Sequence, residues 1–471
     1  MSHTVTAAMR SGMRGAVALA FVLGLSAPCA ALAQPLAPSA GGQAPGCPAP
    51  GQEPGIGHEP RFTDSNVALY AGGDYTADGG TAEAEGLLVV AGNATFAKTS
   101  GGVFNIGRVG AGSGILPPSG AVMLAVGGDV KIAKGTTVDV GHGLTAGPRY
   151  GGSVAVGGAI DEKGSLETNG GSRTAGMGAR AALSPYDSFG DTIRRESASL
   201  GALKSTGTTT RSGETVTFKG AGGKAAGPQV FEIAAKELDG ASTFLFTGIP
   251  EGAAVVVNVT GGQAVAVSPL SVGFNGDRAD TYDSPRFGEA ASRILYNFEG
   301  STSLSLGGGG NFMGSILAPK ATADLTASTN GRVYVGGDIR THGTGNESHN
   351  YPWTGSSTFT CRPTPKAPET PGEVPSTPPG GAKPSATPTP TATSTSTAPP
   401  APAPTTTRPG EETTPPATPG TSEAPPTGGG TGDGSLATTG GEVGSYLVAA
   451  AALGAAGGAV LLVTRRRRAQ G

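Results

Sequence analysis

Cysteine, histidine and aromatic residues are scarce in this chain of 471 residues. It holds 3 cysteines, 5 histidines and 1 tryptophan, and only 5% of its residues are aromatic. No cysteine lies within the body of the predicted folded region, which excludes an internal thioester. The histidines belong to no His-Glu-x-x-His helix, and no Gly-x-Ser-x-Gly elbow is present, so these two hydrolase signatures are absent.

Charge is also scarce, since charged residues make up 14% of the chain and the formal net charge is −3. Nucleic acids and acidic membrane surfaces attract strongly basic proteins. The composition therefore predicts neither of them as a partner.

Glycine and proline are abundant, with 82 and 38 residues, far above the roughly 7% and 5% of average proteins. The prolines gather in residues 362–435, where 20 of them lie and no aromatic residue occurs. Such a segment cannot bury enough apolar surface to fold. It predicts a disordered, extended Pro/Thr-rich linker that spans a cell wall.

The N-terminus has the pattern of a secretory signal peptide. Arg10 and Arg14 precede an apolar run, and the small residues before Gln34 predict cleavage between Ala33 and Gln34. Residues 1–33 are therefore assigned to the signal peptide, and residues 34–54 to a flexible segment.

The C-terminus combines an apolar run with a basic tail. Residues 446–464 carry no charge and are just long enough to span a bilayer as a transmembrane helix. Residues 465–471 open with four arginines, which favour the cytoplasmic side. The alternative, a buried core helix, does not suit a run that follows a long low-complexity spacer.

A pentapeptide precedes this run: Leu436, Ala437, Thr438, Thr439 and Gly440. With the span and the arginines it resembles a sortase sorting signal of Gram-positive surface proteins, in which Ala437 replaces the usual proline. The resemblance implies cleavage between Thr439 and Gly440 and attachment of Thr439 to peptidoglycan. Sortase and peptidoglycan are then processing partners, and the transmembrane helix holds only the precursor in the membrane.

Two cysteines remain after signal removal, Cys47 and Cys361, at the two ends of the folded region. In an oxidising exterior such a pair forms a disulfide, here closing the region end to end. The alternative is two free thiols in flexible flanks.

Between residues 55 and 361 a short pattern of β-formers, a Gly-Gly or Ala-Gly pair and often Asp or Asn recurs. It appears as "ALYAGGDYTA", "LLVVAGNATFA", "MLAVGGDVKIA", "GSVAVGGAID" and "RVYVGGDIRT". Repeats of this kind predict a mostly β fold, a β-solenoid whose short strands stack in successive turns. The glycines are expected at positive-φ corners. Asp74, Asn93, Asp129 and Asp338 are then corner residues and not ligands.

One segment, "SPYDSFGDTIRRESASLGALKS", departs from this pattern. Ser184, Pro185 and Asp187 have the chemistry of a helix start. An apolar stripe then runs from Phe189 to Leu203. The spacing predicts one amphipathic helix over residues 185–204, packed along the solenoid.

Few residues offer chemistry. His342 and His349, with Glu347 between them, could hold a metal ion, but a surface loop is the simpler interpretation, and no metal is assigned. The acids Asp161, Glu162 and Asp191 are expected on solvated loops and helix faces. Regular threonine ranks for ice binding are missing, because "TGTTTRSGETVTF" is a single cluster.

The segments "NVALYAGGDYTADGG", "GSILAP" and "HNYPWTG" make residues 55–361 similar to the choice-of-anchor A domain of bacterial surface proteins. The resemblance implies an adhesive domain with a right-handed, ice-binding-like β-solenoid and one flanking helix. It brings no catalytic or ligand-binding residues and no cofactor.

The sequence thus predicts a wall-anchored extracellular adhesin and not an enzyme. Its ligand would be a host matrix protein, a polysaccharide or another cell. Two alternatives remain: a glycan-active enzyme on a β-helix, with acidic residues in one groove, or a structural coat protein that self-associates.

Overall fold

Short parallel strands dominate the fold of residues 46–363, which the computed structural model describes apart from residues 50, 58, 146–148 and 225–226. The predicted signal peptide with Ala33 and Gln34, nearly all of the linker, the sorting signal and the transmembrane segment lie outside these residues. Within the described part, every helix is too short or too polar to cross a bilayer.

Three parallel sheets form the sides of a solenoid. The ten-stranded sheet consists, from one edge to the other, of β15 (Arg173–Thr174), β12 (Ser153–Val156), β9 (Val122–Val126), β5 (Leu87–Val90), β2 (Val67–Ala71), β30 (Val333–Val335), β27 (Ser315–Ala318), β24 (Ile294–Asn297), β20 (Val255–Thr260) and β18 (Gln229–Ala234). The eight-stranded sheet consists, in the same direction, of β13 (Ile160–Glu162), β10 (Val130–Ile132), β6 (Ala94–Lys98), β3 (Tyr75–Gly79), β31 (Ile339–Thr341), β28 (Thr322–Leu325), β25 (Ser303–Leu306) and β21 (Val265–Val267).

The seven-stranded sheet consists of β14 (Ser165–Glu167), β11 (Thr136–Val140), β7 (Gly102–Gly107), β4 (Glu83–Glu85), β32 (Glu347–His349), β29 (Ser328–Asn330) and β26 (Asn311–Met313). A five-stranded sheet follows at one end, with β16 (Thr208–Ser212), β17 (Thr215–Lys219), β19 (Thr243–Thr247), β22 (Ser271–Phe274) and β23 (Asp277–Arg278). A separate pair joins β1 (Phe62–Thr63) to β8 (Ile115–Leu116). A complete turn of the solenoid, or rung, contributes one strand to each of the three main sheets, whereas the rungs at the end with β18 and β20 contribute to fewer of them. The predicted solenoid of mostly β structure is confirmed.

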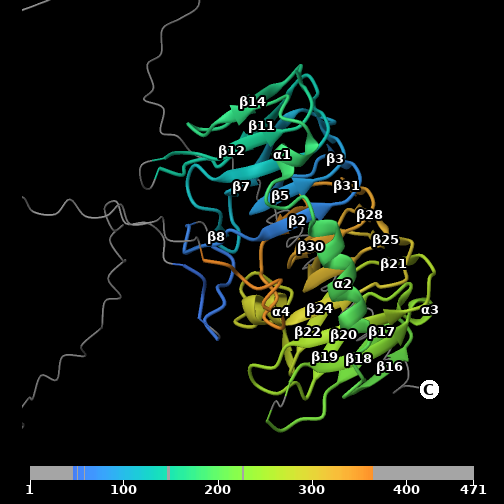
Figure 1. Cartoon of the computed structure of the whole chain (residues 1–471). Helices are drawn as coiled ribbons and strands as arrows, with labels where there is room; N and C mark the ends of the chain where they lie inside the picture. The colour runs from blue at the N-terminus through green and yellow to red at the C-terminus, as the bar shows by residue number, and fades with distance from the viewer. Residues whose placement is uncertain (1–45, 50, 58, 146–148, 225–226, 364–471) are drawn as a thin grey trace, which may run out of the picture. The chain divides into compact units, whose positions relative to one another are not determined.

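The rungs do not stack in chain order, which the sequence did not predict. The chain begins in the middle with β2, β3 and β4, and the next rungs stack on one side of it (Figure 1). After β15 it crosses to the other end and returns, so that the last rung (β30, β31, β32) pairs with the first. Leu69 faces Val333, Tyr75 faces Ile339 and Glu83 faces Glu347. We call this contact between the first and last rungs the seam.

Alternating side chains fill the solenoid interior, because successive residues of a strand point to opposite faces. The interior core includes Leu69, Tyr75, Phe96, Phe104 and Val335, all at most 3% exposed. The recurrent Val-x-Val and Leu-x-Val segments of the sequence supply this inward face.

The glycine pairs are required because neighbouring rungs approach closely there, and not because the backbone has a positive φ. This corrects the predicted corner conformation. Gly72 and Gly128 are absent from the positive-φ glycines of the described chain. A Cβ on Gly72 would lie 2.4 Å from the carbonyl oxygen of Gly336, and one on Gly128 would lie 2.4 Å from Asn93 Oδ1. Successive rungs approach too closely at this corner for any side chain.

The flanking helix exists but is shorter than predicted. Helix α2 runs over Phe189–Gly201, and the segment before it contains the short α1 (Ala179–Leu183) and a turn around a cis Ser184–Pro185 bond. Pro185 is therefore not in the first helical turn. Tyr186 instead donates its hydroxyl to the Ser65 carbonyl at 2.5 Å, a tertiary contact that holds this stretch outside the helix.

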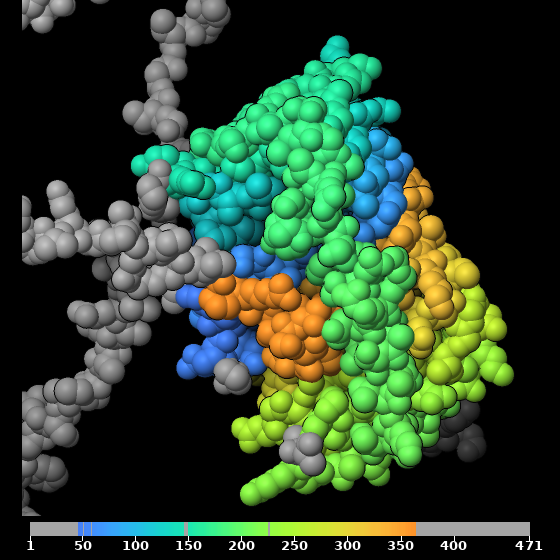
Figure 2. Space-filling model, in the orientation of Figure 1, coloured from blue at the N-terminus to red at the C-terminus, as the bar shows by residue number. Residues whose placement is uncertain are grey.

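Helix α2 packs on the outer face of the ten-stranded sheet, where a second core joins Phe189, Ile193 and Leu200 to Tyr70 and Tyr334. Figure 2 shows the helix in green as a ridge across this face, beside the last described residues, which are orange. The predicted apolar stripe extends past the end of the helix, because Leu203 lies beyond α2 and is 40% exposed. The remaining helices of the described chain are short: α3 (Ala235–Leu238) and α4 (Phe287–Arg293).

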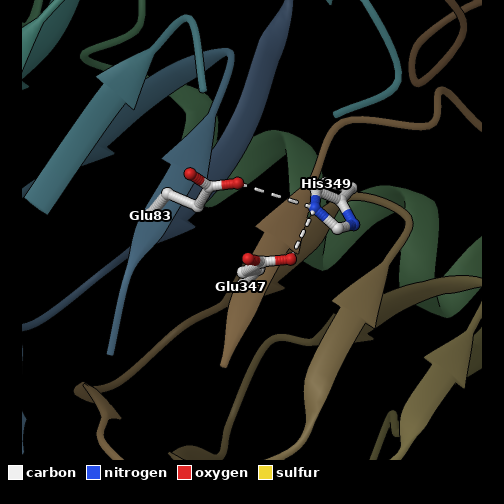
Figure 3. A group of neighbouring side chains, drawn as sticks. All are labelled: Glu83, Glu347 and His349. Carbon is white, nitrogen blue, oxygen red and sulfur yellow. Dashed lines mark ion pairs between the residues drawn. The ribbon is translucent and has the colours of Figure 1, made fainter. Parts of the chain in front are cut away.

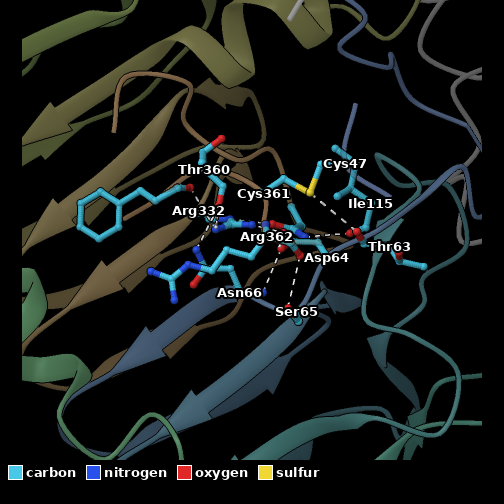
Figure 4. Close-up of a disulfide and its surroundings, with 12 residues drawn as sticks. Cys47, Thr63, Asp64, Ser65, Asn66, Ile115, Arg332, Thr360, Cys361 and Arg362 are labelled. Carbon is cyan, nitrogen blue, oxygen red and sulfur yellow. Dashed lines mark hydrogen bonds and ion pairs between the residues drawn. A yellow bond between two sulfur atoms is a disulfide. The ribbon is translucent and has the colours of Figure 1, made fainter. Parts of the chain in front are cut away.

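A disulfide and a buried ion pair join the start of the folded region to its end near the seam (Figure 4). Cys47 and Cys361 form a disulfide across 314 residues of chain, so Cys47, in the segment assigned as flexible, is tied to the end of the domain. Nearby, Arg332 and Asp64 form a fully buried ion pair. Arg332 also donates to the carbonyls of Phe359 (3.0 Å) and Thr360 (3.3 Å), and so fixes the end of the domain. Burial lowers the pKa of Arg332, but Asp64 outweighs burial and the net shift is upward.

Candidate functional site

Three ionisable side chains meet on the outer face of the seven-stranded sheet, at the seam. Glu83 comes from β4 of the first rung, and Glu347 and His349 come from β32 of the last rung (Figure 3). One ligand atom from each lies within 4.8 Å of the other two. We call these three residues the seam triad.

The seam triad arises from strand register. Glu83 and Glu347 are directly paired on neighbouring strands, and His349 is two residues further along β32, on the same face. His349 Nε2 lies 3.3 Å from Glu347 Oε2 and 3.8 Å from Glu83 Oε1. Like charges placed opposite each other in a sheet repel. The two carboxylates therefore need a positive partner, and the imidazole is aimed between them.

The triad is buried yet incompletely hydrogen-bonded. The side chains of His349 and Glu83 are 0% and 2% exposed, and that of Glu347 is 15% exposed. His349 Nε2 and Glu83 Oε1 have no hydrogen-bond partner among the described residues. Glu83 Oε2 accepts the Gly110 amide at 3.2 Å, which leaves Oε1 directed at the histidine. Buried polar atoms without partners are rare and point to a group that completes the site.

The other nitrogen of the imidazole, Nδ1, is hydrogen-bonded to Asn330. His349 Nδ1 lies 2.8 Å from Asn330 Oδ1, and an amide oxygen only accepts, so Nδ1 carries the hydrogen. Asn330 in turn donates to Asn311 Oδ1 at 3.1 Å. On the open side, Tyr282 donates its hydroxyl to Glu347 Oε2 at 3.3 Å. The asparagines and the tyrosine thus orient both members from β32.

Electrostatics follow from this packing. Burial lowers the pKa of His349, but the contacts with Glu347 and Glu83 and the charge of Glu85 outweigh it and raise the pKa to about 10. Burial raises the pKa of Glu85, although amides of Ser113 and Asn350 oppose that shift. Burial and the nearby Glu347 charge raise the pKa of Tyr282. The neighbouring carboxylates therefore favour the protonated form of His349.

Of the residues weighed for a metal in the sequence, the structure brings two together and separates one. His349 and Glu347 belong to the triad, whereas His342 Nε2 lies 2.9 Å from Asp324 Oδ1 on the eight-stranded sheet. Glu83 was missed, because it is 264 residues from Glu347 and only the seam makes them neighbours. A weak signal existed in the alternation Glu83-Ala84-Glu85, which puts two acids on the outer face of one strand.

The three acids considered for glycan chemistry lie on two elements. Asp161 and Glu162 are on β13, and Asp191 is on α2. Each has a basic neighbour: Lys163 lies 3.8 Å from Asp161, Arg173 pairs with Glu162, and Arg194 pairs with Asp191.

The predicted corner residues do form the corner, and they form it as a ladder. Asp338 Oδ1 accepts the amide of Asp74 (2.8 Å), Asp74 Oδ1 accepts that of Asn93 (2.7 Å), and Asn93 Oδ1 accepts that of Asp129 (2.9 Å). Asp129 Oδ1 then accepts the amide of Ala159 at 2.8 Å. Each side chain therefore satisfies the backbone of the next rung.

A second candidate site is the outer face of the eight-stranded sheet, where one outward residue per strand stands in register across all eight strands. This eight-strand row consists of Asp161, Lys131, Thr95, Thr76, Arg340, Asp324, Ser305 and Ala266. All eight residues are partly or fully exposed. Strands spaced about 4.8 Å apart make the row roughly 34 Å long.

Comparison with known proteins gives a family. A model of the family described as "Putative Ice-binding-like adhesive domain" matches residues 67–350. No curated protein matches the chain. The crystal structure of an ice binding protein from an Antarctic biological consortium matches at 16% identity and a TM-score of 0.22, covering 60% of this chain and 86% of that chain.

Proposed function

The chain belongs to the ice-binding-like adhesive domain family, and from that membership we propose that it is a surface adhesin that binds an extracellular polymer through its solenoid. The match covers the rungs on both sides of the seam as well as the flanking helix. We choose the outer face of the eight-stranded sheet as the binding surface because of the eight-strand row, which is regular, exposed and long.

The chemistry of the row favours a polar chain polymer. Lys131 lies beside Asp161 and Arg340 lies beside Asp324, and two threonines separate these charged pairs. A repeat of about 4.8 Å presents the same kind of contact many times to a periodic ligand. Each contact is weak, but contacts on one domain and on many copies add by avidity. Mixed charge suits a polysaccharide or an extended protein segment better than an uncharged threonine rank would.

The proposal includes secretion and covalent display. Residues 1–33 would direct export, residues 362–435 would carry the domain through the wall, and a sortase would join Thr439 to peptidoglycan. The support is the order of motif, apolar span and arginines in the sequence. Mass spectrometry of the C-terminus in wall and membrane fractions tests it: Thr439 linked to a wall peptide is expected, whereas an intact tail ending at Gly471 in the membrane would refute wall attachment.

Binding is tested with cells that display the full chain. Adhesion to immobilised collagen, fibrinogen, hyaluronate and chitin is measured for the wild type, for Lys131→Glu on the eight-strand row and for Lys204→Glu as a matched exposed lysine beyond α2. We expect at least one surface to bind, and only Lys131→Glu to weaken that binding.

The alternatives predict different results. Release of soluble sugar from a polymer would favour a glycan-active enzyme. Self-association without binding to any surface would favour a structural coat protein.

A further inference from the structure

We propose that the seam triad, Glu83, Glu347 and His349, is a mononuclear divalent-metal site of the zinc class that joins the first rung to the last. The adhesin proposal does not require this site, and the site does not depend on any ligand of the eight-strand row. Ligand spacing, donor chemistry, burial and the orientation of the histidine support it.

The spacing suits one metal ion. Zinc bonds of 2.0–2.1 Å in a tetrahedron place neighbouring ligand atoms about 3.3–3.4 Å apart. His349 Nε2 lies 3.3 Å from Glu347 Oε2 and 3.8 Å from Glu83 Oε1. The ligand oxygens of Glu83 and Glu347 lie within 4.8 Å of each other, so the two carboxylates would move together by at most about 1.5 Å for the three atoms to occupy three corners. The fourth corner would be open to water, as in zinc sites with three protein ligands.

The donor set selects the class of metal. One imidazole and two carboxylates give a nitrogen and oxygen set that zinc and similar first-row ions accept, whereas calcium and magnesium prefer oxygen ligands alone. The triad contains no sulfur ligand. Zinc is therefore the probe of choice, and cobalt is its spectroscopic substitute.

The histidine is already oriented as a ligand. Its Nδ1 hydrogen is donated to Asn330, so the Nε2 position faces the two carboxylates. Metal-bound histidines almost always donate their second nitrogen to such an outer partner. Asn330 is 0% exposed and is itself fixed by Asn311, so this orientation is set by packing and not by solvent.

Charge balance explains why a cation belongs at the triad. Two buried carboxylates face one imidazole, and the side chains of Tyr282 and Glu85 add no positive charge. A divalent ion would balance the two carboxylates and satisfy both Nε2 and Glu83 Oε1, the two triad atoms that lack hydrogen-bond partners among the described residues. Lys98 donates its ammonium to the Thr81 carbonyl at 2.5 Å and acts on Glu83 through its charge, but it makes no direct ion pair with the triad.

A metal ion at the triad would hold the first and last rungs together. Glu83 and His349 belong to strands from opposite ends of the folded region, and the pairing of β4 with β32 on this sheet is short. A metal bound by both would stabilise the folded state, and the stabilisation would increase with the logarithm of the free metal concentration above the Kd. The site would therefore act beside the disulfide and the Arg332–Asp64 pair as a third closure of the seam.

The experiment uses the full chain, stripped with EDTA and dialysed against zinc, followed by metal analysis and thermal unfolding. Glu347→Gln removes the most exposed ligand and leaves the buried Glu83–His349 pair in place. His342→Gln is the matched control, since His342 lies on the same rung outside the triad. Asn330→Ala tests the orienting contact, and loss of such a partner costs roughly 10- to 100-fold in metal affinity.

We expect one zinc per chain, a higher melting temperature with zinc, and an intense visible spectrum of tetrahedral cobalt. Glu347→Gln should lose all three, whereas His342→Gln should keep them. The proposal is overturned if the wild type retains no metal, or if Glu347→Gln and His342→Gln bind equally. Should a variant fail to fold, anomalous diffraction on the wild type decides, because it locates the metal either between Glu83, Glu347 and His349 or at another histidine, such as His342 beside Asp324.

Discussion

Asp338 accepts the backbone amide of Asp74 at 2.8 Å, although 264 residues separate them in the chain. This bond is the step of the corner ladder that crosses the seam. The other steps join rungs that also follow each other in sequence, Asp74 to Asn93 and Asn93 to Asp129. The same hydrogen bond therefore joins the last rung to the first as joins rungs that follow each other in the sequence.

The corner ladder should contribute to stability at its seam step. Asp338→Ala leaves the Asp74 amide without its acceptor, and we expect the free energy of unfolding to fall by about 1 kcal/mol, the usual net value of a hydrogen bond. Chemical denaturation measures it. Asp161→Ala is the control, because Asp161 has only a distant, exposed pairing with Lys163. An equal loss in both variants would contradict the ladder.

The buried Arg332–Asp64 pair should be sensitive to loss of one partner. Arg332→Met leaves Asp64 as a buried charge without its cation, and such losses cost roughly 3–5 kcal/mol. The double variant Arg332→Met with Asp64→Asn should recover part of that loss, since no unpaired charge remains. Equilibrium unfolding of the wild type, the single variants and the double variant gives the coupling. Additive effects would show that the pair contributes nothing beyond side-chain packing.

Helix α2 should depend on its buried positions and not on the end of the predicted stripe. Ile193 is fully buried against the ten-stranded sheet, so Ile193→Ala should lower stability by about 2–5 kcal/mol. Leu203→Ala, at an exposed position past the helix, should stay within about 0.5 kcal/mol of the wild type. Thermal and denaturant unfolding compare the two. Similar losses would mean that the helix extends to residue 203 in solution.

The metal-free protein should lose stability at alkaline pH. The pKa of His349 is raised from 6.5 to about 10 in the folded state, so its contribution is complete below pH 6.5 and declines as pH rises through about 10. Unfolding in EDTA across this range should show a decline in the wild type that His349→Gln lacks. His342→Gln should retain the wild-type slope. Parallel curves for the wild type and His349→Gln would contradict a charged His349 in the folded protein.

Local patterns in the sequence were enough for the class of fold. The recurrent segments of β-formers and glycines predicted the strands of a solenoid, and four of these segments cover all or most of the neighbouring strands β2, β5, β9 and β12. The position of Asp74, Asn93 and Asp129 after the glycines predicted a corner. These inferences succeeded because strand alternation and corner turns are short-range properties.

The helix shows where local signals mislead. Ser184, Pro185 and Asp187 have the composition of a helix start, yet the bond of Tyr186 to the Ser65 carbonyl keeps this stretch in a turn. The glycine pairs mislead similarly, because glycine permits both positive φ and close approach. Only the position of the neighbouring rung decides between the two.

The sequence by itself determined a glycine-rich β-solenoid with a polar corner, a cysteine at each end and an apolar helix face, because periodicity and composition act over a few residues. The tertiary structure decided that the last rung closes on the first, and with it the meeting of Glu83 with Glu347 and His349. Strand pairing between such distant parts of the chain leaves no mark on local sequence, since β4 and β32 each have the pattern of an ordinary short strand. Their register at the seam places two carboxylates and an imidazole on one face.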